Sequence, residues 1–173
     1  QEHARISPRR EESVEAILGR ARRLQIERIR LEPSGVKEAC MPVASPIHEF
    51  LQKAHVSYTV LPHRPAYTAQ EEAASIHIPG RDWAKVIVCI VDGEPIEAVL
   101  PACAVVNLDR LLTLAGGRKI RLAREHELLQ LYPDCEPGAM PPFGPLYGQA
   151  VFVDAALATE PDIVFNGGTH TEA

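Results

Sequence analysis

The chain has 173 residues, of which 46% are hydrophobic and 24% are charged, and this composition is typical of a globular protein rather than a disordered one. Its longest apolar run, residues 86–91, is far shorter than the ~20 residues that a membrane-spanning helix needs. The N-terminus lacks the pattern of a secretory signal peptide. We therefore expect a cytoplasmic protein with no membrane contact.

The net charge of −5 is distributed unevenly along the chain. Residues 1–41 carry nine Lys or Arg and seven Asp or Glu, whereas residues 42–173 carry nine and sixteen. A protein that binds a long phosphate backbone usually has a broad basic surface. Any contact with a nucleic acid is therefore expected to be short and local.

The cysteines are far apart, without the close spacing of zinc ligands. They are Cys40, Cys89, Cys103 and Cys135. We expect free thiols in a reducing compartment and no metal site. The chain also lacks both glycine-rich nucleotide-binding motifs, so no nucleotide cofactor is expected.

The start of the chain differs from the rest. Residues 11–31 are rich in Arg and Glu and carry a rough helical stripe of apolar side chains, which ends at the turn residues 33–35. This pattern predicts a charged, helical N-terminal extension over residues 1–41, followed by a separate domain over residues 42–173.

The second part of the chain predicts short helices interspersed with strands. Helices are expected over residues 45–54, 68–78, 108–115 and 124–131. Strands are expected over residues 57–61, 84–91, 96–100, 119–122, 149–153 and 162–165. The Asp92-Gly93 pair predicts a tight hairpin between two of them. Because βαβ alternation is absent, we predict an α/β (α+β) fold with a mixed β-sheet curled into a partial barrel and short surrounding helices.

Lys85 is the most informative single residue, because it begins the apolar strand 84–91. Both faces of that strand are apolar, which predicts a central position in the sheet. A lysine there either reaches solvent along its stem or meets an anion.

Two glycine-containing loops are further candidates. In residues 138–142, Gly-Ala-Met-Pro-Pro, proline stiffens the chain and the amides of the first three residues could converge on a carbonyl oxygen or a phosphate. The alternative is a stiff loop that covers the edge of the sheet. After the strand 162–165, the segment 166–170 brings His170 towards the strand end, as a catalytic or a structural histidine.

Covalent catalysis has little support in the sequence. No serine lies in a nucleophile-elbow motif. Glu71, Glu72 and Asp82 are candidates for a carboxylate pair, but charges on helix faces are usually solvated. The remaining possibility is a site that positions a substrate and a water molecule.

These features together resemble the YbaK/prolyl-tRNA-synthetase-associated (INS-like) family of aminoacyl-tRNA editing domains. The matching stretches are residues 63–71, 84–88, 138–142 and 165–170, and the resemblance extends over about three quarters of the chain. It implies a metal-independent and cofactor-free deacylase that serves translation fidelity. The loop interior favours members that clear small amino acids of the Ser, Thr and Ala class.

The resemblance also implies the site residues and the partners. Lys85 and His170 would be the catalytic residues. The implied substrate-binding residues are Tyr67, Thr68, Gly138, Ala139, Met140, Pro142, Asn166, Gly167 and Gly168. The partner would be the aminoacylated acceptor end of a tRNA, which a local basic patch would contact. The residues of that patch are Arg118, Lys119, Arg121 and Arg124.

Alternatives concern catalysis and the ends of the chain. The alternative to an enzyme is a non-catalytic module of the same fold that binds tRNA or a synthetase. The helix 11–31 would be its docking element. We expect a monomer. The chain stops at Ala173, where relatives usually carry a further helix, so the resemblance implies a domain shortened at its C-terminus or an inactive member.

Overall fold

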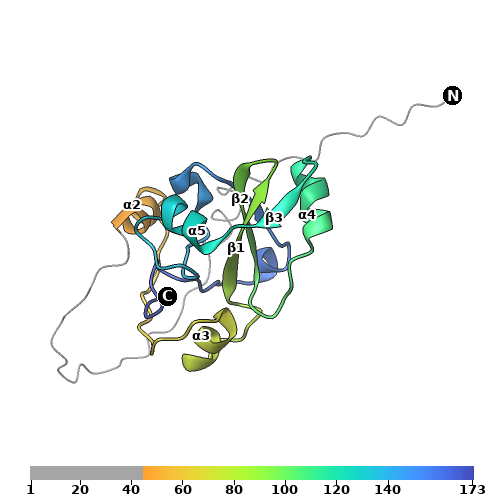
Figure 1. Ribbon diagram of the computed structural model, residues 1–173. Helices are drawn as coiled ribbons and strands as arrows, with labels where there is room; N and C mark the ends of the chain where they lie inside the picture. Colours follow the sequence, from red (N-terminus) through yellow and green to blue (C-terminus); the bar gives the residue numbers. More distant parts are fainter. Residues whose placement is uncertain (1–44) are drawn as a thin grey trace, which may run out of the picture. The chain divides into compact units, whose positions relative to one another are not determined.

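The computed structural model describes residues 45–173, and the predicted extension 1–41 with its helix lies outside them. A four-stranded mixed sheet forms the centre of the described part (Figure 1). Its strands are β1 (Ala84–Val91), β2 (Glu94–Pro101), β3 (Ile120–Leu122) and β4 (Ala150–Val153). They lie in the order β3-β1-β2-β4, with β1 antiparallel to β2 and β3, and β2 parallel to β4. The predicted fold class is confirmed, and β1 is central as expected.

Short helices surround the sheet. They are α2 (Ser45–Lys53), α3 (Ala69–Ser75), α4 (Leu108–Ala115), α5 (Glu125–Leu131) and the 3-10 turns η1 (Gly144–Tyr147) and η2 (Leu157–Thr159). Their ends follow the predicted signals. The Asn107 side chain accepts a hydrogen bond from the backbone N–H of Arg110 at the start of α4, and Gly116 ends that helix with a φ of 69°. Asp92 and Gly93 have φ values of 51° and 103°, as a tight hairpin turn requires.

Two of the six predicted strands are wrong. Residues 57–61 are extended but join no sheet, and nearby Pro62 forms only an isolated bridge with Glu172. Residues 162–165 likewise contribute one bridge, between Val164 and Trp83. Leu61 and His63 form backbone hydrogen bonds with Ala173 and Thr171, which belong to no strand of the sheet. Val164 forms backbone hydrogen bonds with Ala84 and Asp82 at the start of β1.

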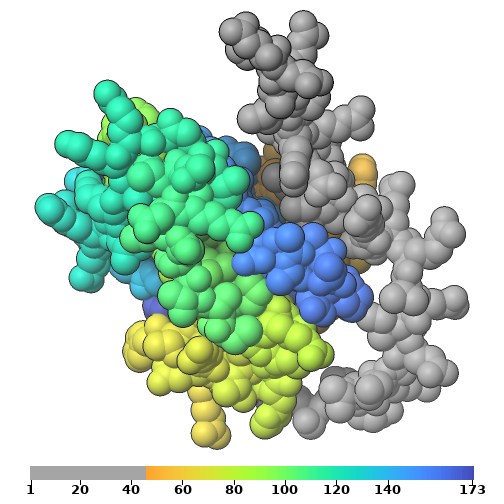
Figure 2. Space-filling view, turned by 90° about the vertical axis from the view of Figure 1, so that its right-hand side faces the viewer, coloured from red at the N-terminus to blue at the C-terminus, as the bar shows by residue number. Residues whose placement is uncertain are grey.

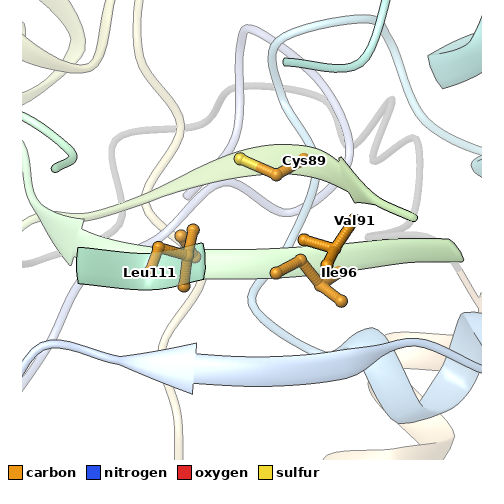
Figure 3. Packing of buried hydrophobic residues seen from close by; sticks show 5 residues of the cluster. Cys89, Val91, Ile96 and Leu111 are labelled. Carbon is orange, nitrogen blue, oxygen red and sulfur yellow. The ribbon is translucent and has the colours of Figure 1, made fainter. Parts of the chain in front are cut away.

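The two faces of the sheet are covered by different elements. On one face, Cys89, Val91, Ile96 and Leu111 form a buried cluster beneath α4 (Figure 3). On the other face, Val88 packs with residues of α5 and of the following loop, and α4 and α5 lie on different sides of the strands in Figure 1. Alternation along β1 places Lys85 on the α4 face, with Cys89.

Three of the four cysteines lie in the described residues. Cys89 is buried, Cys103 is exposed and Cys135 is half-buried, and each is a free thiol as predicted. Cys40 lies outside the described residues. No helix among residues 45–173 is both long and apolar enough to cross a bilayer.

Candidate functional site

A cavity of about 450 Å³ lies at the C-terminal end of the described chain. Its walls come from three segments, 65–67, 136–137 and 170–171, and from Glu125 at the start of α5. Backbone hydrogen bonds join these walls, because Ala66 N–H donates to the carbonyl oxygen of His170 at 3.4 Å. The cavity is therefore built from segments that are far apart in the sequence.

His170 connects two of these walls. Its Nδ1 lies 3.0 Å from the Glu72 carboxylate, and its Nε2 lies 3.0 Å from the carbonyl oxygen of Pro137. Both partners accept hydrogen bonds, so the protonated ring, in which both nitrogens donate, satisfies both contacts. Burial works against that charge, but the hydrogen bond and charge of Glu72 outweigh it and raise the pKa of His170.

This geometry decides what His170 can do. A ring that holds both of its protons in hydrogen bonds cannot accept a third from a water molecule. With these two contacts His170 acts as a clamp that fixes Pro137 and the loop after it, and its catalytic role stays a prediction. The imidazolium also packs against the ring of Tyr67, with ring centroids 5.1 Å apart.

Glu72 is a site residue that the sequence interpretation missed. It was expected to be a solvated charge on α3, but its side chain is almost completely buried. Its carboxylate accepts hydrogen bonds from His170 and from the Asn166 amide, at 3.0 and 3.1 Å. The signal was present, because Glu72 follows Ala69 by three residues and precedes Ile76 by four, and both belong to the buried stripe of α3.

The loop 138–142 lies directly beside this clamp. Gly138 is exposed with a φ of 99°, and a Cβ atom there would lie 3.2 Å from the His170 ring. Ala139 and Met140 are buried. The cavity lining includes Glu136 and Pro137, which precede the loop, and none of residues 138–142.

The predicted convergence of loop amides is not present in this conformation. The Gly138 N–H donates to the Met140 sulfur at 3.1 Å, and the Ala139 N–H donates to the Glu136 carbonyl oxygen at 2.9 Å. Two of the three amides are thus directed at atoms of the loop itself. Pro142, which is half-buried, follows this turn.

Lys85 is not part of the cavity wall. Its ammonium group donates to the carbonyl oxygens of Ala102 and Ala104, at 2.9 and 2.6 Å. Among residues 45–173 it makes no side-chain hydrogen bond to Glu72, His170 or the loop 138–142. The segment after β2, whose carbonyl oxygens accept these hydrogen bonds, is green in Figure 2 and runs between α3 and α4. The three predicted features are therefore not all brought to one place.

Helix α3 nevertheless connects Lys85 with the clamp. The Gln70 amide donates to the carbonyl oxygen of Ala102 at 3.4 Å, and Lys85 shares that acceptor. Glu72, two residues further along the same helix, holds His170. The lysine and the cavity are thus two neighbouring features on either side of α3, and not one pocket.

The remaining predicted substrate-binding residues have structural partners. Thr68 Oγ1 accepts a hydrogen bond from the Glu71 N–H at the start of α3, which confirms the predicted capping interaction. Gly167 N–H donates to the Glu172 carbonyl oxygen, and the Gly168 carbonyl oxygen accepts from Glu136 N–H. Together with buried Asn166, these residues shape the turn that carries His170.

Two of the four residues of the predicted basic patch pair with carboxylates. Arg121 forms two hydrogen bonds of 2.6 Å with Glu127, and Arg118 lies 3.7 Å from Asp92. No group of three or more metal-ligating side chains occurs in the part of the chain that the structure describes.

The fold is a mixed α/β domain with a small cavity lined by Glu136, Pro137 and His170. A family model for the aminoacyl-tRNA editing domain matches residues 63–173, which is well over half of the chain. The chain therefore belongs to the aminoacyl-tRNA editing domain family, which confirms the predicted resemblance and supports a role in editing of charged tRNA. No curated protein matches the chain.

Solved structures share the fold. A crystal structure of a putative trans-editing enzyme for prolyl-tRNA synthetase is 21% identical with a TM-score of 0.65, and the match covers 78% of this chain and 85% of that one. A crystal structure of the hypothetical protein APE2540 is 22% identical, also with a TM-score of 0.65, over 74% of this chain and 85% of that one. At these identities the likeness establishes the fold alone.

Proposed function

We propose that this protein is a trans-editing aminoacyl-tRNA deacylase of the YbaK type, which hydrolyses the ester between a wrong small amino acid and its tRNA. The proposed amino acids are those of the Ser, Thr and Ala class. The observation that carries the proposal is the cavity beside the clamped loop, in a chain of the editing family. Its volume of about 450 Å³ lies in the range of small-ligand sites and suits one aminoacyl end. Charged tRNA is used in the cytoplasm, where we place the protein.

The reaction needs few protein groups. The oxygen of a water molecule bonds to the ester carbonyl carbon, the bond to the ribose oxygen breaks, and that oxygen takes a proton from the water. His170 acts in this proposal as a positioning residue that holds Pro137 and the loop after it. The neighbouring ribose hydroxyl of the substrate is the group that orients the water, so no metal is required.

Lys85 binds an anion in this proposal. An ammonium group has three N–H donors, and two of them already contact the carbonyl oxygens of Ala102 and Ala104. The third is left for a ligand, and a phosphate near the acceptor end is the group that fits its charge. A charge-assisted hydrogen bond of this kind contributes ~1.5–3 kcal/mol, or about 10- to 100-fold in affinity.

The test is deacylation of seryl-, threonyl-, alanyl- and cysteinyl-tRNA by the wild type and by Lys85→Met, which keeps the aliphatic stem. Lys53→Met is the matched control, because Lys53 is exposed on α2 and pairs only with Glu49. We expect hydrolysis of at least one small amino acid ester, at least about tenfold slower with Lys85→Met and unaffected by a chelator. If no ester is hydrolysed faster than in buffer, the proposal is wrong. Binding of charged tRNA without hydrolysis would instead favour the non-catalytic module.

A further inference from the structure

The free charges of the cavity wall are negative. Glu125 and Glu136 are exposed residues that both line the cavity. His170 pairs with buried Glu72 at 3.0 Å and also interacts with the charge of Glu136, so it offsets the two carboxylates only in part. A phosphate would be repelled from such a cavity, whereas a cation would be attracted.

The wall also contains an aromatic surface. The Tyr67 side chain is 75% exposed, although one part of its ring is held against His170. The Tyr67 ring thus contacts His170 and leaves most of its surface open to solvent. Aromatic faces attract cations within about 6 Å of the ring centre. Tyr67 and the carboxylates therefore favour the same kind of ligand.

We propose that this cavity binds the free α-ammonium group of the aminoacyl ester, between the carboxylates of Glu136 and Glu125 and the ring of Tyr67. This inference rests on the proposed function and adds the way in which the substrate is oriented. The acceptor end of a charged tRNA is anionic except for that one ammonium group. The only substrate group whose charge suits the cavity is therefore the one attached to the amino acid.

Glu136 is held in place before any ligand arrives. One of its carboxylate oxygens accepts a hydrogen bond from the backbone N–H of His170 at 2.8 Å, and its own N–H donates to the Gly168 carbonyl oxygen at 2.8 Å. A carboxylate oxygen can accept more than one hydrogen bond, so Glu136 keeps capacity for a ligand. A group that is already ordered loses little conformational entropy on binding.

The direct test compares two ligands, one with this charge and one in which an acetyl group removes it. One is alanine joined to the ribose of adenosine through a stable amide, with a free amino group, and the other is its N-acetyl form. We expect wild-type protein to bind the free amine at least about tenfold more tightly, as a charge-assisted hydrogen bond provides. Glu136→Gln and Glu125→Gln should each reduce that preference, and the double variant should abolish it. Glutamine at position 136 still accepts from the His170 N–H, so the wall is retained.

Controls separate this inference from the proposed function. Glu94→Gln removes one exposed carboxylate next to the hairpin turn and should keep the full preference for the free amine. Equal binding of the two ligands by the wild type, or a preference that survives in the double variant, would overturn the inference even if the ester is hydrolysed. If the preference for the free amine depends on Glu136 but the protein hydrolyses no ester, the cation site is supported and the proposed deacylase activity is wrong.

Discussion

Glu97 offers the sharpest test of the interior of the fold. It lies on β2 with its side chain completely buried, where the Tyr132 hydroxyl donates to one carboxylate oxygen at 2.8 Å. The Gly144 N–H donates to the other oxygen at 2.9 Å. Burial raises the pKa of this carboxyl group from 4.5 to about 7, although both hydrogen bonds favour the charged form.

The raised pKa makes stability depend on pH with a definite sign. Between about pH 4.5 and 7 the folded protein holds a proton on Glu97 that the unfolded chain releases. The free energy of unfolding therefore falls as the pH rises through this window and stays lower above it. A pKa difference of this size corresponds to about 3 kcal/mol between the two ends of the window.

Glu97→Gln removes the titration and keeps the shape. The new amide oxygen can accept from Gly144 N–H, and the amide nitrogen can donate to the Tyr132 oxygen. The Tyr132 hydroxyl then donates to Gln149 Oε1, which already lies 2.9 Å away. The contacts of Glu97 with Tyr132 and Gly144 are thus kept without a carboxyl group, so we expect the variant to fold and to lose the pH dependence of Glu97.

Urea unfolding at pH 5 and pH 8 measures the effect. The single tryptophan, Trp83, is completely buried and reports the transition by fluorescence. Relative to the wild type, the variant should gain about 3 kcal/mol of stability on going from pH 5 to pH 8. Other titrating groups are the same in both proteins and cancel in this difference. If the difference between variant and wild type is the same at both pH values, the reasoning about Glu97 is wrong.

Three further substitutions test the clamp and the helix ends. Glu72→Gln leaves the buried imidazolium of His170 without its counter-charge, so we expect a loss of about 3 kcal/mol in urea unfolding and a fall in the pKa of His170 by NMR titration. An unchanged pKa would contradict the ion pair. Gly138→Ala combines positive φ with a contact of 3.2 Å to His170 and should lower Tm more than Gly148→Ala, which has a φ of 69° but no neighbour within 4 Å. Asn107→Ala should cost about 1 kcal/mol in thermal unfolding through the lost cap of α4, and a smaller loss than for Thr113→Ala would refute that role.

Local signals explain why most elements could be predicted from the sequence. The hairpin at Asp92-Gly93 and the limits of α4 depend on residues next to each other in the chain, and both are confirmed. The two segments wrongly expected as strands, 57–61 and 162–165, depend on partners elsewhere. Extended sequence alone does not provide a neighbouring strand for the ladder. Each segment found only single bridges at the end of the sheet.

The site shows the same limit at the level of side chains. Thr68 was predicted as a cap and is one, because its partner lies three residues away. The partners of His170 are Glu72 and Pro137, which are separated from it by 98 and 33 residues. Periodicity indicates that Glu72 is buried, but no pattern along the chain indicates which distant group it pairs with. The clamp could therefore be found only from the fold.

Because Lys85 is separate from the cavity, the positive and negative groups of the site lie in different places, which the sequence interpretation did not predict. Lys85 lies on the α4 face and binds the segment after β2, whereas Glu136 and Tyr67 line the cavity near α5. In the two proposals, the lysine takes a phosphate and the carboxylates take the ammonium group, so opposite charges of one substrate go to opposite sides of α3. Reversing the substrate would bring phosphate to Glu136 and the ammonium to Lys85, and both contacts would be repulsive. Charge alone thus favours a single orientation of the acceptor end, without a broad basic surface to hold the rest of the tRNA.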